Sequence, residues 1–100
     1  MNRGTFLVLM ALLDGAKHGY EISKYIEERS RGFFRMPFGT LYPILHRLEK
    51  EGNVKVKIDD FSGAKSKKVY TLTSSGKKLA KEEVSEFDLL SKAIKWMVPV

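Results

Sequence analysis

The side chains with chemistry to offer in this 100-residue chain are two histidines, scattered hydroxyls and a large set of cations. His18 and His46 lie in different segments with no HExxH or Cys/His spacing around them, and cysteine is absent, so no metal site is indicated. The chain also lacks a GxSxG nucleophile elbow, a P-loop and a GxGxxG loop. The sequence therefore predicts a protein that is not an enzyme and needs no cofactor.

The cations are concentrated in the middle of the chain. Residues 29–81 hold 13 of the 18 Lys and Arg residues but only 4 of the 12 Asp and Glu residues. Thirteen cations less four acids give this segment a net charge of +9, and five cations less eight acids give the rest −3. A basic middle indicates a polyanionic partner such as nucleic acid. On charge alone, a solvated lysine-rich surface is the alternative.

Hydrophobic spacing predicts three helices, a hairpin and a last long helix. The first helix covers about residues 5–13, an apolar run too short for a membrane span, which needs about 20 residues. It has the outline of a signal peptide but no small-x-small cleavage site follows, so a buried helix explains it better. With no cysteine and no span, we expect a cytoplasmic protein without membrane contact.

The second helix follows Gly19 and the third covers about residues 39–50, before the helix terminators Gly52 and Asn53. The period then changes to two in VKVKI (residues 54–58) and in KVYTL (residues 68–72), which predicts an antiparallel hairpin. Thr73 is a good N-cap for the last helix, which should reach about Trp96. We expect a mostly helical α+β fold: a winged helix-turn-helix in residues 1–72 and one C-terminal helix in residues 73–98.

The third helix has one apolar and one polar face. Leu41, Ile44, Leu45 and Leu48 recur at helical spacing and predict the core side, and the other side offers hydrogen-bond donors, a ring and cations. In a winged helix this element enters the DNA major groove. Arginine can read guanine, and a lysine near the helix end meets phosphate. The predicted DNA-binding residues of this helix are Thr40, Tyr42, Pro43, His46, Arg47 and Lys50.

Gly39 and Pro43 are the two poorest helix formers, yet they stand at the head of this helix. A helix starting at about Gly39 would place Pro43 in or just after its first turn, where missing N–H groups cost little. On this interpretation Gly39 and Pro43 lie at the start of the helix, where Thr40, Tyr42 and Pro43 can contact DNA.

The hairpin adds further cations, since Lys55 and Lys57 lie on its outward face and its turn region holds Lys65, Lys67 and Lys68. Singly, each is an ordinary solvated lysine. Together with the polar face of the third helix, the three turn lysines predict contact with the DNA backbone.

The last helix carries an apolar stripe longer than so small a body can cover. Its first turns should pack on the first helix, and the remainder predicts a second subunit as partner. The residues expected to line the dimer interface or a ligand pocket are Phe6, Val84, Phe87, Leu90, Ile94 and Trp96.

Three motifs in order, HGYEI (residues 18–22), GTLYPILHRLEKEG (residues 39–52) and KVYTLTSSGKKL (residues 68–79), resemble the PadR family of transcriptional regulators. A single helix after the wing is similar to the smaller of its two subgroups. The resemblance implies a homodimeric bacterial or archaeal repressor that binds double-stranded DNA at a palindromic operator and is often released by a small molecule.

By position, the resemblance places Thr40–Pro43 and Arg47 in the recognition helix and Lys65, Lys67 and Lys68 in the wing. Wings of the family are often rich in arginine; lysine lacks the planar fork, so we expect phosphate contact here. In relatives that bind aromatic drugs, an aromatic residue of the last helix lines a flat pocket between subunits. Its counterpart resembles Phe87, with Phe6 beside it, and the alternative is that Phe87 serves only the dimer core.

Two other functions remain open from the sequence. A winged helix can use a basic face to bind an acidic protein partner instead of DNA. A small-molecule sensor with secondary DNA affinity is the other possibility, and a small aromatic effector would fit it.

Overall fold

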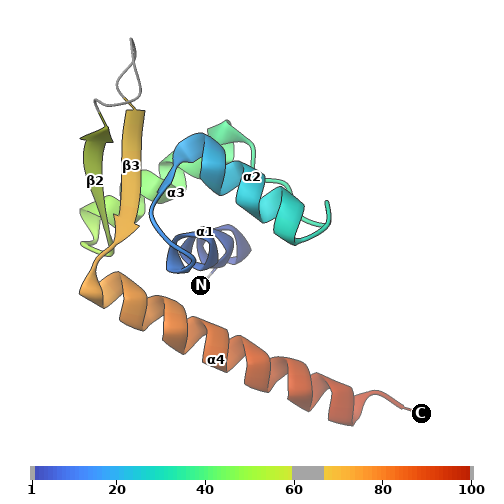
Figure 1. Cartoon of the computed structure of the whole chain (residues 1–100). Helices are drawn as coiled ribbons and strands as arrows, with labels where there is room; N and C mark the ends of the chain where they lie inside the picture. The colour runs from blue at the N-terminus through green and yellow to red at the C-terminus, as the bar shows by residue number, and fades with distance from the viewer. Residues whose placement is uncertain (1, 60–66, 100) are drawn as a thin grey trace.

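The computed structural model describes residues 2–59 and 67–99, which form helices and one small sheet (Figure 1). No helix among these residues is long and apolar enough to cross a membrane. In chain order the elements are α1 (Arg3–Leu13), β1 (Lys17–His18), α2 (Gly19–Arg29), α3 (Phe38–Lys50), β2 (Val54–Asp59), β3 (Lys67–Leu72) and α4 (Ser74–Met97). This order is the winged helix-turn-helix predicted from the sequence.

Local signals set the helix ends. Asn2 caps α1 by accepting a hydrogen bond from the Thr5 backbone N–H at 2.8 Å, and Thr73 caps α4 through the Gly76 N–H at 3.1 Å. The end of α3 is made by Gly52, whose φ of 81° is in the region that favours glycine. The Asn53 N–H then donates to the Leu48 carbonyl at 2.9 Å.

Helix α3 begins at Phe38, within one residue of the predicted start. The first four N–H groups of a helix lack intrahelical partners, and Pro43, as the sixth residue, lies just beyond them. It therefore leaves the Gly39 carbonyl without its usual donor. Both residues are exposed, so that carbonyl can bond to solvent and the proline is tolerated.

The sheet has one strand more than the sequence analysis predicted. The hairpin β2–β3 forms as expected, in a register that sets Val54 opposite Leu72 and Val56 opposite Tyr70. The added strand is β1, which pairs antiparallel with the other edge of β3, so the strand order is β1-β3-β2. A two-residue strand is too short to show a period of two, and this explains why hydrophobic spacing did not reveal it.

The core lies where α1, α2 and α3 meet the base of the hairpin. Leu9, Ile22, Leu41, Leu45 and Leu48 are at most 1% exposed, which confirms the predicted inner face of α3. Gly4 permits the close approach of α1 to α3, because a Cβ there would lie 2.9 Å from the Ile44 side chain. The body thus holds α3 by packing against it with α1, α2 and β2.

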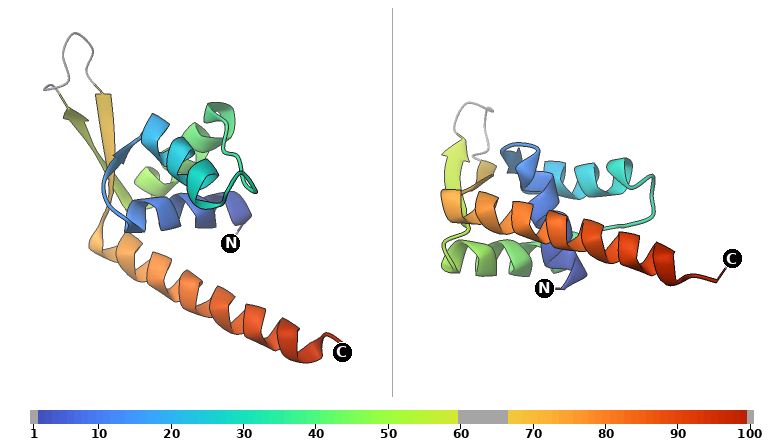
Figure 2. Two further views of the ribbon diagram at one scale, coloured as in Figure 1. Left: turned by 45° about the vertical axis from the view of Figure 1, so that its right-hand side comes forward. Right: turned by 90° about the horizontal axis from the view of Figure 1, so that it is seen from below.

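Helix α4 begins directly after β3 and runs along α1 and beyond it (Figure 1, Figure 2). Only its first turns are buried, through Gly76 and Ala80. A helix of 24 residues is about 36 Å long, and it gives the molecule dimensions of 58 × 28 × 20 Å. The outer half of α4 consequently has no body of its own chain to cover it.

Candidate nucleic-acid interface

All six residues predicted on the DNA-facing side of α3 are exposed. At 100° per residue, Pro43, His46 and Lys50 lie near the centre of this face, opposite the buried leucines. Gly39 lies on the same face, and a Cβ built there would meet no atom within 4 Å. The head of α3 is therefore open to close approach by another molecule.

Tyr42 lies at the edge of this face and packs against α2. Its hydroxyl oxygen is 2.6 Å from the position that a Cβ of Gly19 would occupy, so a side chain at residue 19 would displace the ring from this place. The ring also lies near Phe38, with centroids 5.9 Å apart, and the side chain remains 47% exposed. Gly19 thereby fixes the side of α3 on which the tyrosine is presented.

Arg47 lies at the other edge of the face and bonds to α1. Its Nη2 donates to the Thr5 hydroxyl at 2.9 Å, and Thr5 is only 6% exposed. The sequence motifs gave no sign of this bond, since the two residues are 42 positions apart. In this arrangement the guanidinium is anchored at one nitrogen, and its remaining donors stay available to a ligand.

The wing adds cations on both faces of the hairpin. The described lysines of the hairpin are all exposed: Lys55, Lys57, Lys67 and Lys68. Lys65 lies outside the described residues. The register places Lys57 opposite Val69 and Lys67 opposite Asp59 on one face, and Lys68 opposite Ile58 on the other. The wing stem thus presents positive charge in two directions.

Within the described part of the chain, no ion pair neutralises the lysines of α3 and the wing stem; the pairs found involve other residues. Lys24–Glu28, Arg35–Glu27 and Lys92–Asp88 are examples, all on exposed surface. Lys50 of α3 and the described lysines of the wing stem therefore keep their positive charge available. Positive surface of this kind attracts a polyanion over several ångströms in low salt.

Two observations bear on enzymatic chemistry. Among the described residues there is no group of three or more His, Cys, Asp or Glu side chains arranged to hold a metal ion. Burial, together with the nearby Tyr42 and Glu49, raises the pKa of Tyr70, so its phenol stays protonated near neutral pH. Tyr70 is 5% exposed in the core, so its role is structural.

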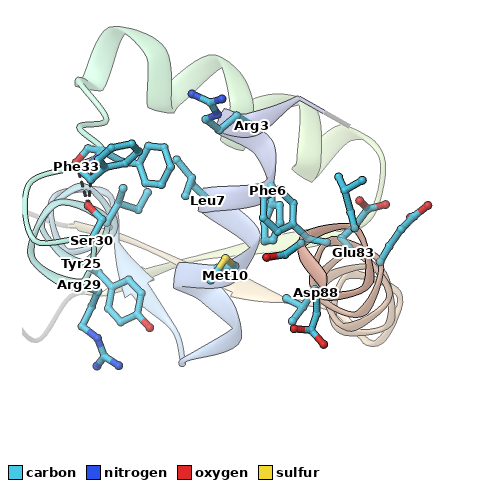
Figure 3. Close-up of a pocket in the computed structure, with 17 residues that line it drawn as sticks. Arg3, Phe6, Leu7, Met10, Tyr25, Arg29, Ser30, Phe33, Glu83 and Asp88 are labelled. Atoms are coloured by element: carbon cyan, nitrogen blue, oxygen red, sulfur yellow. Dashed lines mark hydrogen bonds between the residues drawn. The ribbon is translucent and has the colours of Figure 1, made fainter. Parts of the chain in front are cut away.

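A second feature is a groove of about 1100 Å³ between α1, the end of α2 and α4 (Figure 3). Phe6 of α1 and Phe87 of α4 contact each other edge to face, with ring centroids 5.2 Å apart. Tyr25 and Phe33 line the opposite side, and Leu7 and Met10 of α1 lie between the two walls. The groove is mainly apolar, with Arg3, Arg29, Glu83 and Asp88 at its rim.

Of the six residues predicted for a dimer or ligand pocket, four line this groove: Phe6, Val84, Phe87 and Leu90. Ile94 lies on the same stripe of α4 farther along, 51% exposed. Trp96 is nine positions from Phe87, half a turn away in angle at 100° per residue, and is 77% exposed. The structure therefore does not bring Trp96 to the groove.

The first three helices and the hairpin place the polar, cationic face of α3 beside a wing that carries lysines. This arrangement defines a DNA-binding protein of the winged helix-turn-helix class. The comparison with protein families narrows this class. Residues 8–82 match the transcriptional regulator PadR-like family. The chain belongs to that family, whose members are regulators of transcription and not enzymes.

Individual relatives agree with this assignment. The negative transcriptional regulator PadR of Bacillus subtilis is 33% identical over 72 residues, which are 72% of this chain and 40% of that protein. A structure of Bacillus subtilis PadR in complex with operator DNA superposes with a TM-score of 0.72 at 30% identity, covering 80% of this chain and 45% of the other.

A PadR family regulator from Clostridium difficile matches over the whole fold. It superposes with a TM-score of 0.83 at 26% identity and covers 98% of this chain and 100% of its own. This chain therefore has the length of that short regulator, while it spans less than half of the Bacillus subtilis protein.

Proposed function

We propose that this protein is a homodimeric transcriptional repressor that binds a palindromic operator through α3 and the wing. The observation that carries the proposal is the exposed face of α3, which combines His46, Arg47 and Lys50 beside a wing stem bearing four lysines. The Bacillus subtilis relative is named a negative regulator and has been seen with operator DNA. A repressor of this kind acts where DNA lies, in the cytoplasm.

The roles of the contact residues follow from their chemistry and position. Thr40, Tyr42 and Pro43 lie at the open head of α3, where a hydroxyl and apolar carbons can contact base edges, including the methyl group of thymine. Arg47 keeps free donors for a base or a phosphate. Lys50, near the end of the helix, and Lys67 and Lys68, in the wing, are point charges suited to phosphate.

The dimer is proposed to form along α4. Phe87, Leu90 and Ile94 follow one side of this helix and are each more than half exposed. A second copy, related by a two-fold axis, would cover this stripe with the same stripe of its own. Two recognition helices would then read half-sites about 34 Å apart along the DNA.

A small planar aromatic molecule is the proposed effector, and its place is the groove beside Phe87. The rings of Phe6 and Phe87 offer stacking surface there, and the charged rim can orient polar substituents. The alternative is that the second subunit fills the groove and Phe87 serves only the dimer core. Planar aromatic compounds can be titrated into a mixture of the dimer and operator DNA while operator affinity is measured. This experiment separates the two alternatives, because only an effector changes operator affinity.

The test of DNA binding is affinity for the protein's own promoter region, measured as salt rises. On duplex DNA, each phosphate that the protein neutralises contributes about 0.9 to the slope of log K against log salt. The double variant Lys67→Ala/Lys68→Ala should therefore reduce the magnitude of this slope by about 1.8 per protomer. Lys95→Ala, near the end of α4, is the control and should leave the slope unchanged.

Two results would overturn the proposal. One is equal affinity for the promoter and for random duplex, and the other is an unchanged slope in the wing variant. Both together would favour a winged helix that binds an acidic protein with its basic face.

A further inference from the structure

His18 lies between two carboxylates that come from different parts of the fold. Its Nδ1 is 2.5 Å from Oε1 of Glu21 in α2, and its Nε2 is 3.3 Å from Oδ2 of Asp59 at the end of β2. The His18 and Asp59 side chains are each 26% exposed, and Glu21 is 52% exposed. The imidazole therefore links the first turn of α2 to the root of the wing.

This link crosses the central strand of the sheet. His18 pairs with Val69 of β3, and Val69 pairs on its other side with Lys57 of β2. The two edge strands make no backbone bonds with each other, because β3 lies between them. The side chains of His18 and Asp59 thus join strands about 10 Å apart, at the last described residue before the wing tip.

The segment around His18 also touches the recognition helix. Gly19 provides the space for the Tyr42 hydroxyl of α3, and the Glu21 carboxylate accepts from the His18 backbone N–H at 2.7 Å. That backbone hydrogen bond is the main reason why the pKa of Glu21 is lowered. Residues 18 and 19 are consequently in contact with both of the elements proposed to bind DNA.

The protonation state of His18 decides whether both links can exist. An ionised carboxylate only accepts hydrogen bonds, so a ring nitrogen must carry a proton to bond to it. A neutral imidazole has one N–H and can serve one of the two carboxylates; the imidazolium serves both. When the ring is neutral and donates to Glu21, the lone pair of Nε2 faces the Asp59 oxygen and repels it.

Charged groups share the surroundings of the ring from α2, β2 and β3. Lys17 of β1 directs its Nζ away, to the Ala11 carbonyl and the Asp14 carboxylate, each at 2.8 Å. Lys57 and Lys67 share the sheet face with the ring by register. Among the described residues, the charged groups on this face are Glu21 and Asp59, with Lys55, Lys57 and Lys67 placed there by the register.

We propose that His18 is a positioning residue whose protonated ring clasps the wing to the helix-turn-helix and thereby makes DNA affinity dependent on pH. The proposal rests on the proposed DNA-binding function. A wing root held at Asp59 has less freedom before DNA is bound, so less conformational entropy is lost on binding. Affinity should therefore fall as rising pH removes the proton that the ring needs for both bonds.

The experiment compares DNA affinity at pH 6 and pH 8, at constant ionic strength, for four proteins. In the wild type we expect weaker binding at pH 8 by about threefold for each protomer, the size of a partly exposed ion pair. His18→Gln and Asp59→Asn should each remove that part of the pH dependence. His46→Gln is the matched control, since it removes the only other histidine and should retain the His18 contribution.

A second readout needs no DNA. Backbone ¹⁵N relaxation of Ile58, Asp59 and Lys67 should show a more mobile wing root at pH 8 than at pH 6 in the wild type, and a mobile root at both pH values in His18→Gln. Thermal unfolding checks that the variants are folded.

The outcomes separate this proposal from the proposed function. Equal pH dependence in wild type and His18→Gln, with sequence-specific binding intact, would overturn the clasp and leave the repressor standing. A His18→Gln variant that loses affinity equally at both pH values would show a purely structural histidine and also overturn it. Absence of specific binding in every protein would overturn the repressor, and the relaxation data would then decide the clasp alone.

Discussion

The winged body and the outer half of α4 carry similar apolar side chains in opposite surroundings. In the body, Leu9, Leu41 and Leu48 are at most 1% exposed. On α4, Phe87, Leu90 and Ile94 are between 51% and 56% exposed. The body satisfies its apolar surface within one chain, whereas α4 leaves a continuous stripe in solvent.

Because of this difference, apolar burial stabilises the body and the outer half of α4 through separate contributions. Burying apolar surface contributes about 25 cal/mol per Å², and the body gains it on folding. The outer half of α4 can gain the same contribution only when another surface covers it, so its stability should depend on protein concentration. The stability of the body and the dimerisation of α4 should therefore respond to different substitutions.

The largest expected effect is on the joint between body and α4. A Cβ at Gly76 would lie 2.0 Å from the Asn53 carbonyl oxygen, a backbone atom that cannot move without shifting the chain. Gly76→Ala should therefore lower the free energy of unfolding by about 3 kcal/mol, as overpacking does.

Gly39→Ala is the matched control, because open space surrounds Gly39 and alanine is more favourable than glycine in a helix by about 0.8 kcal/mol. Urea titration measures both, and equal effects would contradict this packing.

The second effect concerns α4 alone. Ile94→Glu should raise the dimer dissociation constant by about a hundredfold, because a carboxylate would be buried in the interface, while the body stays folded. Leu89→Glu is the matched control: Leu89 is 62% exposed and lies on the opposite side of α4 from Phe87. Sedimentation equilibrium gives the dissociation constants. Dissociation by the control variant, or none by Ile94→Glu, would place the interface elsewhere.

The third effect tests how the body holds the recognition helix. Arg47→Ala leaves the largely buried Thr5 hydroxyl without its donor and should lower the free energy of unfolding by about 1 kcal/mol. A double-mutant cycle with Thr5→Val isolates the bond from the rest of each side chain. A coupling energy near zero would mean that Arg47 is held in other ways, and any decrease in DNA affinity would then come from its direct interaction with DNA.

The smallest effect is on acid stability. Hydrogen bonding and charge attraction from Lys17 lower the pKa of Asp14, and the His18 backbone N–H lowers that of Glu21. A carboxyl group whose pKa is lower in the folded chain than in the unfolded chain stabilises the fold at pH values above its pKa in the unfolded chain. This contribution is lost as the pH falls through the pKa of the group in the folded chain. Stability should therefore decline as pH falls below about 4.5, and the double variant Asp14→Asn/Glu21→Gln should decline less steeply. Parallel curves would contradict this linkage.

The elements of the body could be predicted because their sequence signals are local. The stripe Leu41–Leu48 indicated the inner face of α3, Gly52 its end and Thr73 the start of α4. The alternation in the hairpin placed Tyr70 and Leu72 on the same face, and both are at most 5% exposed. These features depend on neighbours along the chain, which a sequence displays.

The contacts between elements could not be predicted in the same way. The short strand β1, the bond from Arg47 to Thr5 and the fit of Tyr42 against Gly19 join residues far apart in the chain. The sequence also grouped Trp96 with Phe87, although helical geometry places them on opposite sides of α4. Such contacts depend on how elements pack, for which a single sequence has no local signal.

The central claim is that two copies of this chain read DNA together. Hydroxyl-radical footprinting of the protein's own promoter region tests it most directly, because the pattern shows both contact and symmetry. The account predicts two protected patches on one face of the duplex, about one helical turn (~34 Å) apart and related by a dyad, and their joint disappearance in Ile94→Glu at concentrations where that variant is monomeric. One asymmetric patch, or no protection at concentrations where the protein is dimeric, would contradict it.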